Sequence, residues 1–224
     1  MENTYRAVNI AFIDEWTKYA EAVGIDLFQV INAIQVRDTH SNIRFPGLGV
    51  GGYCLTKDPT FAPAATKELF GLDLEFPFSK LAGKTNNAMP LHTIERLKSI
   101  LNQEIEGKKI AIFGVTYRQD VGDTRYSASE ILVNNLVQLG AEVTCHDPYL
   151  TFWEEIKCDV LDDYPDLTTF DAVILAVAHS EYRDKDLDYW SKSNLLLDAN
   201  MVLSLDAIKH LKKNNVQIIS IGRG

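Results

Sequence analysis

Hydrophobic positions in the first hundred residues recur every three to four places, which predicts helices. The longest such stripe covers residues 3–23 and comprises Tyr5, Val8, Phe12, Trp16, Tyr19 and Val23. Gly24 is expected to end this helix, and Asp26 to cap a second one. Further helices are predicted for 62–70, 79–88 and 91–101, with Pro90 breaking or opening a helix between the last two.

The pattern changes after residue 105 to short, continuous apolar runs that predict buried strands. Five runs are of this kind: 110–115, 142–147, 171–177, 195–198 and 216–221. Helical stretches separate most of them, and one begins at the capping box of Ser127 and Glu130. Strands that alternate with helices indicate a parallel sheet covered on both faces. We therefore predict an α/β protein with an all-helical region, 1–105, followed by a Rossmann-like parallel-sheet domain, 106–224.

Composition excludes several functional classes. The 224 residues are 46% hydrophobic and carry a net charge of -9, which argues against binding to nucleic acid or to an anionic membrane. Three cysteines without paired spacing are typical of a reducing compartment. No signal peptide and no membrane-length apolar run are found, so a cytoplasmic location is expected. Cys145 and His146 are adjacent in a strand and lack zinc spacing, so we expect no metal site.

A glycine-dense segment, 45–58, delivers a single cysteine, Cys54, to the start of a predicted helix. Such a position activates a thiol as a nucleophile, and Asp58, four residues on, would share its helical face and handle a proton. The segment also matches the dinucleotide fingerprint, but polar residues ending in Pro46 precede it where a buried strand is required. From this stretch alone, a tight loop around a buried structural cysteine is an open alternative.

The sequence of this loop resembles the active-site signature of the UDP-glucose/GDP-mannose dehydrogenase family, the nucleotide-sugar 6-dehydrogenases. The signature, Gly-x-Gly-Gly-x-Cys-x-x-x-Asp, is matched by residues 49–58. Three further stretches resemble the family in the same order: 2–11, 86–90 and 122–127. The resemblance therefore extends over most of the chain.

The resemblance implies that 1–105 is the central dimerisation domain carrying the cysteine loop, and that 106–224 binds a UDP-sugar. In the family an NAD domain and a catalytic lysine precede the motif asparagine, which here is Asn3. The chain is thus expected to be the central and C-terminal parts of a longer enzyme, with the NAD site largely in the missing N-terminal domain. Whether Met1 is a true start, and whether another chain supplies that domain, is left open.

The implied reaction is the NAD-dependent oxidation of a nucleotide sugar at C6 to the uronate, a precursor for polysaccharide synthesis. It would pass through a thiohemiacetal and a thioester on the cysteine, in a cytoplasmic homodimer formed through the central helices. Resemblance implies catalytic roles for Cys54, Asp58 and Asn3, and substrate-binding roles for Gly51, Gly52, Lys57, Arg118 and Arg125. Asn3 is equally an ordinary helix N-cap, and the two arginines, taken alone, are more often surface charges than ligands.

Departures and alternatives remain beside this interpretation. Where the family has Asp-Gly-Arg after a late strand, this chain ends the motif with Asn200, which removes an expected arginine contact. Arg37, His40 and Arg44 precede the glycine loop and are each typical of solvated charges, although the family uses a basic residue here to reach a neighbouring subunit's substrate. One alternative function is a non-catalytic UDP-sugar-binding and dimerising module. A thiol hydrolase or transferase is disfavoured because no histidine lies near the loop in sequence.

Overall fold

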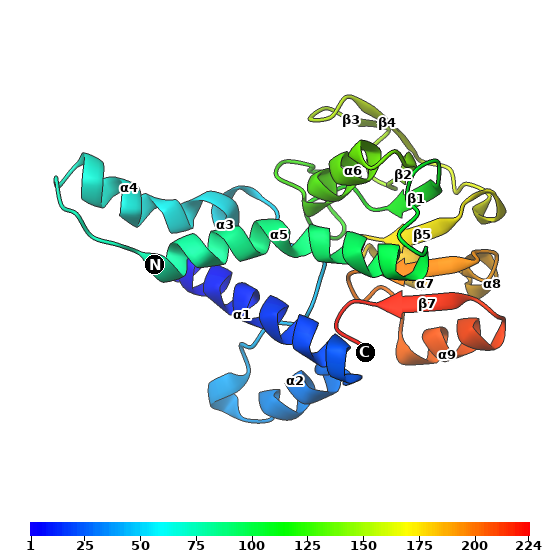
Figure 1. Cartoon of the computed structure of the whole chain (residues 1–224), viewed down its shortest axis with the longest axis horizontal. Coiled ribbons are helices and arrows are strands. Elements are labelled where there is room, and N and C mark those ends of the chain that lie inside the picture. Colours follow the sequence, from blue (N-terminus) through cyan, green and yellow to red (C-terminus); the bar gives the residue numbers. More distant parts are fainter.

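The computed structural model describes residues 1–224, and its first half is entirely helical (Figure 1). The elements in order are α1 (Glu2–Val23), α2 (Leu27–Gln35), η1 (Asp38–His40), α3 (Tyr53–Lys57), η2 (Asp58–Thr60), α4 (Phe61–Glu68) and α5 (Pro77–Ile100). Gly24 ends α1 in the left-handed conformation, with φ 76°. The Asp26 side chain accepts hydrogen bonds from the first amides of α2, so both predicted boundaries are confirmed.

Helix α5 corrects one prediction, because it continues through Pro90 without a break. A proline in a helix interior removes one backbone hydrogen bond and crowds the preceding turn. Here the ring is buried and serves a contact: a Cβ on Gly49 would lie 3.3 Å from its Cδ and Cγ atoms. Packing of the ring against the glycine loop therefore offsets the lost hydrogen bond, and the two predicted helices are one.

The second half contains a seven-stranded sheet of order β3-β4-β2-β1-β5-β6-β7. Its strands are β1 (Lys109–Phe113), β2 (Glu142–His146), β3 (Phe152–Trp153), β4 (Cys158–Leu161), β5 (Ala172–Leu175), β6 (Leu195–Asp198) and β7 (Gln217–Ser220). Only the β3–β4 pair is antiparallel. The five predicted strands are confirmed as β1, β2, β5, β6 and β7, whereas the sequence analysis did not predict the short β3–β4 hairpin at the edge.

Alternation along the strands builds a separate core on each face of the sheet. Ile110 and Ile112 of β1 join one core with residues of α5 and of α6 (Ala128–Gln138). Ala111 and Phe113 join the other core, which α7 (Ser180–Asp184), α8 (Leu187–Trp190) and α9 (Leu205–Lys213) cover. A further short helix, η3 (Leu167–Thr169), contributes Leu167 to this second core. The predicted α/β architecture with helices on both faces is confirmed.

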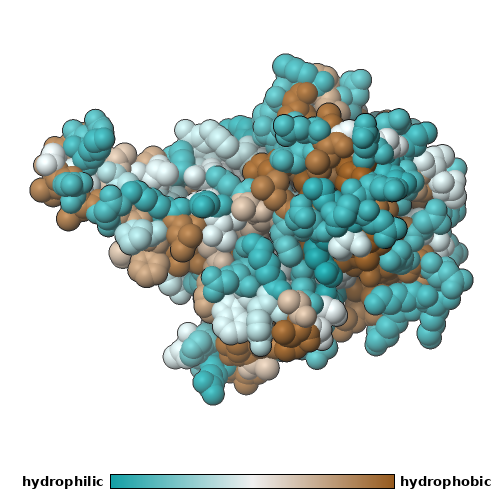
Figure 2. Space-filling model, in the orientation of Figure 1, coloured by the Kyte–Doolittle hydropathy of each residue, from teal (hydrophilic) through white to brown (hydrophobic).

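The apolar stripe that predicted α1 faces outward. Phe12 is 50% exposed and Trp16 is 43% exposed, and Tyr5, Tyr19 and Val23 are exposed as well. The buried face of α1 instead carries smaller and polar residues: Ala7, Ile13, Asp14, Thr17, Ala20 and Glu21. Hydrophobic residues accordingly reach the surface of the helical half in Figure 2. No helix in the structure combines the length and the apolar character needed to cross a membrane.

The C-terminal segment returns to the helical half and fixes it against the sheet. The buried Glu21 carboxylate accepts a hydrogen bond from the Gly222 amide at 2.7 Å, and also contacts His92 at 2.7 Å and Arg96 at 3.2 Å. Arg223 donates to Asp26, the cap of α2, at 3.1 Å. These contacts join α1, α2, α5 and the end of the chain, so the two halves enclose a space of fixed shape between them.

Candidate functional site

The glycine loop packs directly against the segment that follows β1, and this contact explains its composition. Gly52 has φ +80°, and a Cβ placed there would lie 2.8 Å from the Tyr117 ring. A Cβ on Gly51 would lie 2.7 Å from the carbonyl oxygen of Tyr126. Side chains at these positions would force the two segments apart. The glycines therefore bring the cysteine loop of the helical half next to the sheet domain.

Cys54 is the second residue of α3, and its thiol is free and exposed. The amide N–H groups of Gly51 and Gly52 make no hydrogen bond within the chain, so both are available to a ligand. Cys54 and the loop glycines line a cavity of about 410 Å³, together with Arg6 of α1 and Tyr117. An exposed thiol beside free amide donors is an arrangement suited to adding to a carbonyl and stabilising the resulting oxyanion. The alternative of a buried structural cysteine is excluded by this exposure.

Asn3 and Asp58 form a second feature near the loop. The Asn3 Nδ2 donates to Asp58 Oδ2 at 2.7 Å, and this hydrogen bond is the main reason why the Asp58 pKa lies below its usual value. Lys57 Nζ also contacts Asp58 at 3.3 Å while lying over the rings of Tyr53 and Phe61. Asp58 is therefore a carboxylate at neutral pH. The structure thus brings Asn3, Lys57 and Asp58 together, with Asn3 and Asp58 lining a cavity separate from that of Cys54, and the roles of all three remain predictions.

A larger cavity of about 780 Å³ continues from the cysteine cavity into the space between the two halves. The two cavities share six lining residues: Arg6, Ile10, Gly49, Val50, Tyr117 and Arg118. Four arginines from different elements line the larger one, namely Arg6, Arg44, Arg118 and Arg183, and no Asp or Glu is among its lining residues. In a chain of net charge -9, such a cluster indicates an anion site.

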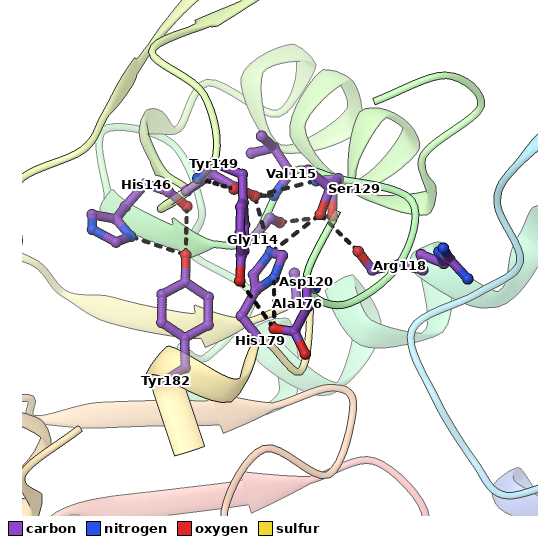
Figure 3. A network of polar contacts seen from close by, with 12 residues as sticks. Gly114, Val115, Arg118, Asp120, Ser129, His146, Tyr149, Ala176, His179 and Tyr182 are labelled. Atoms are coloured by element: carbon purple, nitrogen blue, oxygen red, sulfur yellow. Dashed lines mark hydrogen bonds and ion pairs between the residues drawn. The ribbon is translucent and has the colours of Figure 1, made fainter. Parts of the chain in front are cut away.

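A buried polar network holds the segment after β1 that carries Arg118 (Figure 3). The Asp147 carboxylate is fully buried and accepts hydrogen bonds from the amides of Val115 and Thr116 at 2.9 Å and 3.3 Å. His179 lies beside it, with Nε2 3.2 Å from Asp147 Oδ2. Because His179 Nδ1 accepts a hydrogen bond from the Asp120 amide, the ring proton belongs on Nε2, where it faces Asp147. Arg118 joins the network only through its backbone carbonyl oxygen, which accepts a hydrogen bond from Thr116 Oγ1 at 3.0 Å, so its side chain is not used.

Sequence analysis found only part of this site. It predicted Arg118, which lines both cavities, and Arg125, which lines neither of them and whose guanidinium is bound to the Asp123 carboxylate at 2.6 Å. It missed Arg6 and Arg183, and it described Arg44 as a solvated charge. Arg6 lies in the stretch 2–11 that resembles the family but was not assigned a role, and no local motif marks Arg44 or Arg183, because α1, the η1–α3 segment and α7 meet only in the folded chain. The sequence did contain a signal for the network, because Asp147 and His179 each follow a buried strand.

The sheet domain does not fit a dinucleotide at the turn where Rossmann folds bind pyrophosphate. That site uses free backbone amides after the first strand. Here the amides of Val115 and Thr116, which follow β1, already donate to the buried Asp147 carboxylate. The residues of this turn therefore do not suit NAD. Nor do any three His, Cys, Asp or Glu side chains cluster in a way that would hold a metal ion.

Comparisons with known proteins match two separate stretches of the chain. Residues 1–88 match the UDP-glucose/GDP-mannose dehydrogenase family, central domain, and residues 111–205 match the UDP binding domain of the same family. A UDP-N-acetyl-D-mannosamine dehydrogenase of Methanocaldococcus jannaschii is 33% identical over the whole chain and 50% of its own length. An NDP-N-acetyl-D-galactosaminuronic acid dehydrogenase of Ralstonia solanacearum is 30% identical over 84% of the chain and 43% of its own length.

Solved structures show the same architecture. The crystal structure of NDP-N-acetyl-D-galactosaminuronic acid dehydrogenase from Methanosarcina mazei Go1 aligns with a TM-score of 0.85 and 27% identity, over 99% of this chain and 49% of that one. The chain spans about half the length of the curated relatives it matches. The matched domains, the cysteine loop and the shared fold together show that this chain belongs to the UDP-glucose/GDP-mannose dehydrogenase family of nucleotide-sugar dehydrogenases.

Proposed function

We propose that this chain holds the nucleotide sugar, and supplies the cysteine nucleophile, in the oxidation of a UDP-hexose or UDP-N-acetylhexosamine at C6 to the uronate. The observation that carries the proposal is the continuity of the two cavities: Cys54 lies at one end, Arg44 and Arg183 lie at the other, and Arg6 and Arg118 line both. A diphosphate at the arginine end would direct the sugar toward the thiol. The hydride acceptor, NAD in this family, would be held outside the residues of this cavity.

The chemistry of the cysteine end follows from its groups. The Cys54 thiolate would add to the C6 aldehyde, forming a C–S bond while the carbonyl electron pair moves to oxygen. The free amides of Gly51 and Gly52 would donate to that oxygen. After oxidation to the thioester, a water would attack the acyl carbon, with Asp58 accepting its proton and the thiolate leaving. Asn3 would hold Asp58 in its ionised form through the 2.7 Å hydrogen bond.

The same chain is proposed to assemble as a homodimer through its central helices. Support comes from the outward stripe of α1 and from a groove of about 350 Å³ between α1 and α5, lined by Phe12, Phe78 and Leu81 among others. Aromatic side chains presented in a row are characteristic of buried interfaces. A cytoplasmic location, and a role in polysaccharide precursor synthesis, belong to this proposal as well.

Alkylation of Cys54 with iodoacetamide, followed by peptide mass spectrometry, tests the proposal. A UDP-N-acetylhexosamine should slow the labelling of Cys54 several-fold, whereas UDP alone should slow it less, because UDP fills only the arginine end. Cys158 lies in β4, away from both cavities, and serves as the internal control. Cys54→Ser should leave the calorimetric affinity for the UDP-sugar unchanged.

Two results of this experiment would decide against the proposal. Absence of UDP-sugar binding would remove the nucleotide site. Binding without any protection of Cys54 would favour instead a module that holds the nucleotide sugar but performs no chemistry on it. The turn after β1, which does not suit NAD, is consistent with this alternative.

A further inference from the structure

We propose that Arg183 and Arg44 bind the diphosphate of the nucleotide, supplying the positive charge that Asn200 does not. Both side chains line the larger cavity, and neither belongs to a recognised motif of the chain. The inference rests on the proposed function, because it concerns the nucleotide end of the same cavity.

Charge is the first support. The four arginines of the cavity, Arg6, Arg44, Arg118 and Arg183, form no ion pair with any carboxylate of the chain. Of the four arginines outside the cavity, three are paired with an acidic side chain, namely Arg96, Arg125 and Arg223, and Arg37 is not. Gathering unpaired cations costs electrostatic free energy unless an anion offsets it. Four guanidinium groups suit a ligand with two adjacent phosphoryl groups better than a single phosphate.

Asn200 is committed to a structural contact. Its Nδ2 donates to the carbonyl oxygen of Ala176 at 3.2 Å, which ties the loop after β6 to the end of β5. Its Oδ1 lies 2.8 Å from the place where a Cβ on Gly47 would stand. The side chain therefore fills the gap between the glycine loop and the sheet, and its amide N–H is directed into a backbone contact.

The position of Arg183 is set by the same network that sets Arg118. Helix α7, which carries Arg183, begins directly after His179. Asp120 accepts hydrogen bonds at 2.8 Å from both the amide and the hydroxyl of Ser180, the first residue of α7. Figure 3 shows Asp120 also in contact with His179, the residue that precedes α7, so the segment of Arg118 is joined to the start of this helix. Two guanidinium-bearing segments are thus held in a fixed relation across the carboxyl ends of β1 and β5.

A guanidinium also matches the chemistry of a diphosphate. Its planar fork donates two parallel hydrogen bonds to phosphoryl oxygens, which a lysine cannot do. Arg44 reaches the cavity from the segment before the glycine loop, so it would close the site from the helical half. The diphosphate would then be held by both halves of the molecule.

Calorimetric titration of the 224-residue chain with UDP and with uridine tests this inference. Arg183→Gln and Arg44→Gln should each weaken UDP binding at least about tenfold, and leave uridine binding unchanged. Arg183→Lys should fall between, because it keeps the charge and loses the fork. The matched control is Lys209→Gln, which removes one positive charge from an exposed position on α9 outside both cavities.

The outcomes separate this inference from the proposed function. If the unaltered chain binds UDP, and both arginine variants retain the affinity of Lys209→Gln, the inference is overturned while the nucleotide site stands. If Arg183→Gln weakens UDP and uridine equally, Arg183 acts on the loop and not on the diphosphate, which also overturns it. If the unaltered chain binds no UDP, the proposed function and the inference both fail.

Discussion

The two ends of the cavity are built in opposite ways. At the arginine end, the backbone that carries Arg118 is fixed by Asp147, a buried carboxylate with hydrogen bonds to two amides of that segment. At the cysteine end, Cys54 is exposed, and the amides of Gly51 and Gly52 have no partner in the chain. At the arginine end the backbone amides are therefore satisfied before a ligand arrives while the guanidinium groups stay unpaired, whereas at the cysteine end the backbone amides themselves are free.

This difference separates the end of the cavity that binds the substrate from the end that reacts with it. An anion-binding end gains affinity when its donors are fixed in advance, because little conformational entropy is lost on binding. A reacting end must leave room for a thiol, a carbonyl and a water, so its donors stay unsatisfied until charge develops on the substrate. The comparison predicts that polar substitutions at the arginine end affect stability, whereas those at the cysteine end affect chemistry.

The largest effect is expected for Asp147→Ala. This change leaves the amides of Val115 and Tyr149 and the His179 ring without their buried acceptor. We expect the free energy of unfolding in urea to fall by about 3 kcal/mol or more. Asp58→Ala, at the cysteine end, should lower the unfolding midpoint much less, because that carboxylate is 26% exposed and accepts hydrogen bonds only from side chains that water can also satisfy. Equal losses for the two variants would contradict the division between the ends.

A smaller effect is expected for Gly52→Ala, which tests the contact between the ends. The new Cβ would meet the Tyr117 ring at 2.8 Å while the backbone keeps φ +80°. We expect a loss of about 2 kcal/mol in unfolding free energy, together with weaker protection of Cys54 by a UDP-sugar. The matched variant is Gly71→Ala, which shares a positive φ but has nothing within 4 Å of its Cβ. It should lose only about 1 kcal/mol and keep full protection.

The smallest effect is a dependence of the unfolding free energy on pH that originates in the buried side chain of His146. Burial lowers the pKa of His146, which lies among Phe113, Tyr164 and Tyr182. The unfolded chain, with a histidine pKa of about 6.5, then binds the proton first as the pH falls. Stability is full above that value and declines below it, by at most about 1.4 kcal/mol for each pH unit.

Urea unfolding at pH 7.5 and at pH 5.5 measures this decline. In His146→Phe, whose ring fits the aromatic surroundings and cannot titrate, the loss between the two pH values should be smaller than in the unaltered chain. An identical loss in both proteins would show that other groups cause the acid response.

Local patterns predicted most of the elements, since each boundary depends on residues close in sequence. Gly24 and Asp26 mark the α1–α2 corner, and the run ending at Phe113 marks a buried strand. The helix break predicted at Pro90 is absent, because the lost backbone hydrogen bond is offset by packing of the proline ring against Gly49, which is distant in sequence. The β3–β4 hairpin was missed because its strands have only two and four residues, too few to show a period.

The candidate site also divides into residues that a local motif reveals and residues that only the fold brings together. Cys54, Asp58 and the glycines lie within one short motif, so the sequence and the resemblance identified them together. Arg183 lies more than a hundred residues from that motif, in a five-residue helix, and only the topology of the sheet brings it to the cavity. The position of Arg183 at the cavity depends on where β5 ends in the folded sheet, and composition and motif spacing do not reveal this.

Helix α5 has a consequence for the whole molecule. Its first half belongs to the helical half, where Asn86 donates to the carbonyl oxygen of Ala7, and its second half places Ile94 and Leu97 in a core of the sheet domain. A single continuous helix thus contributes to both halves of the molecule. We therefore expect heat to unfold the helical half and the sheet domain in one transition.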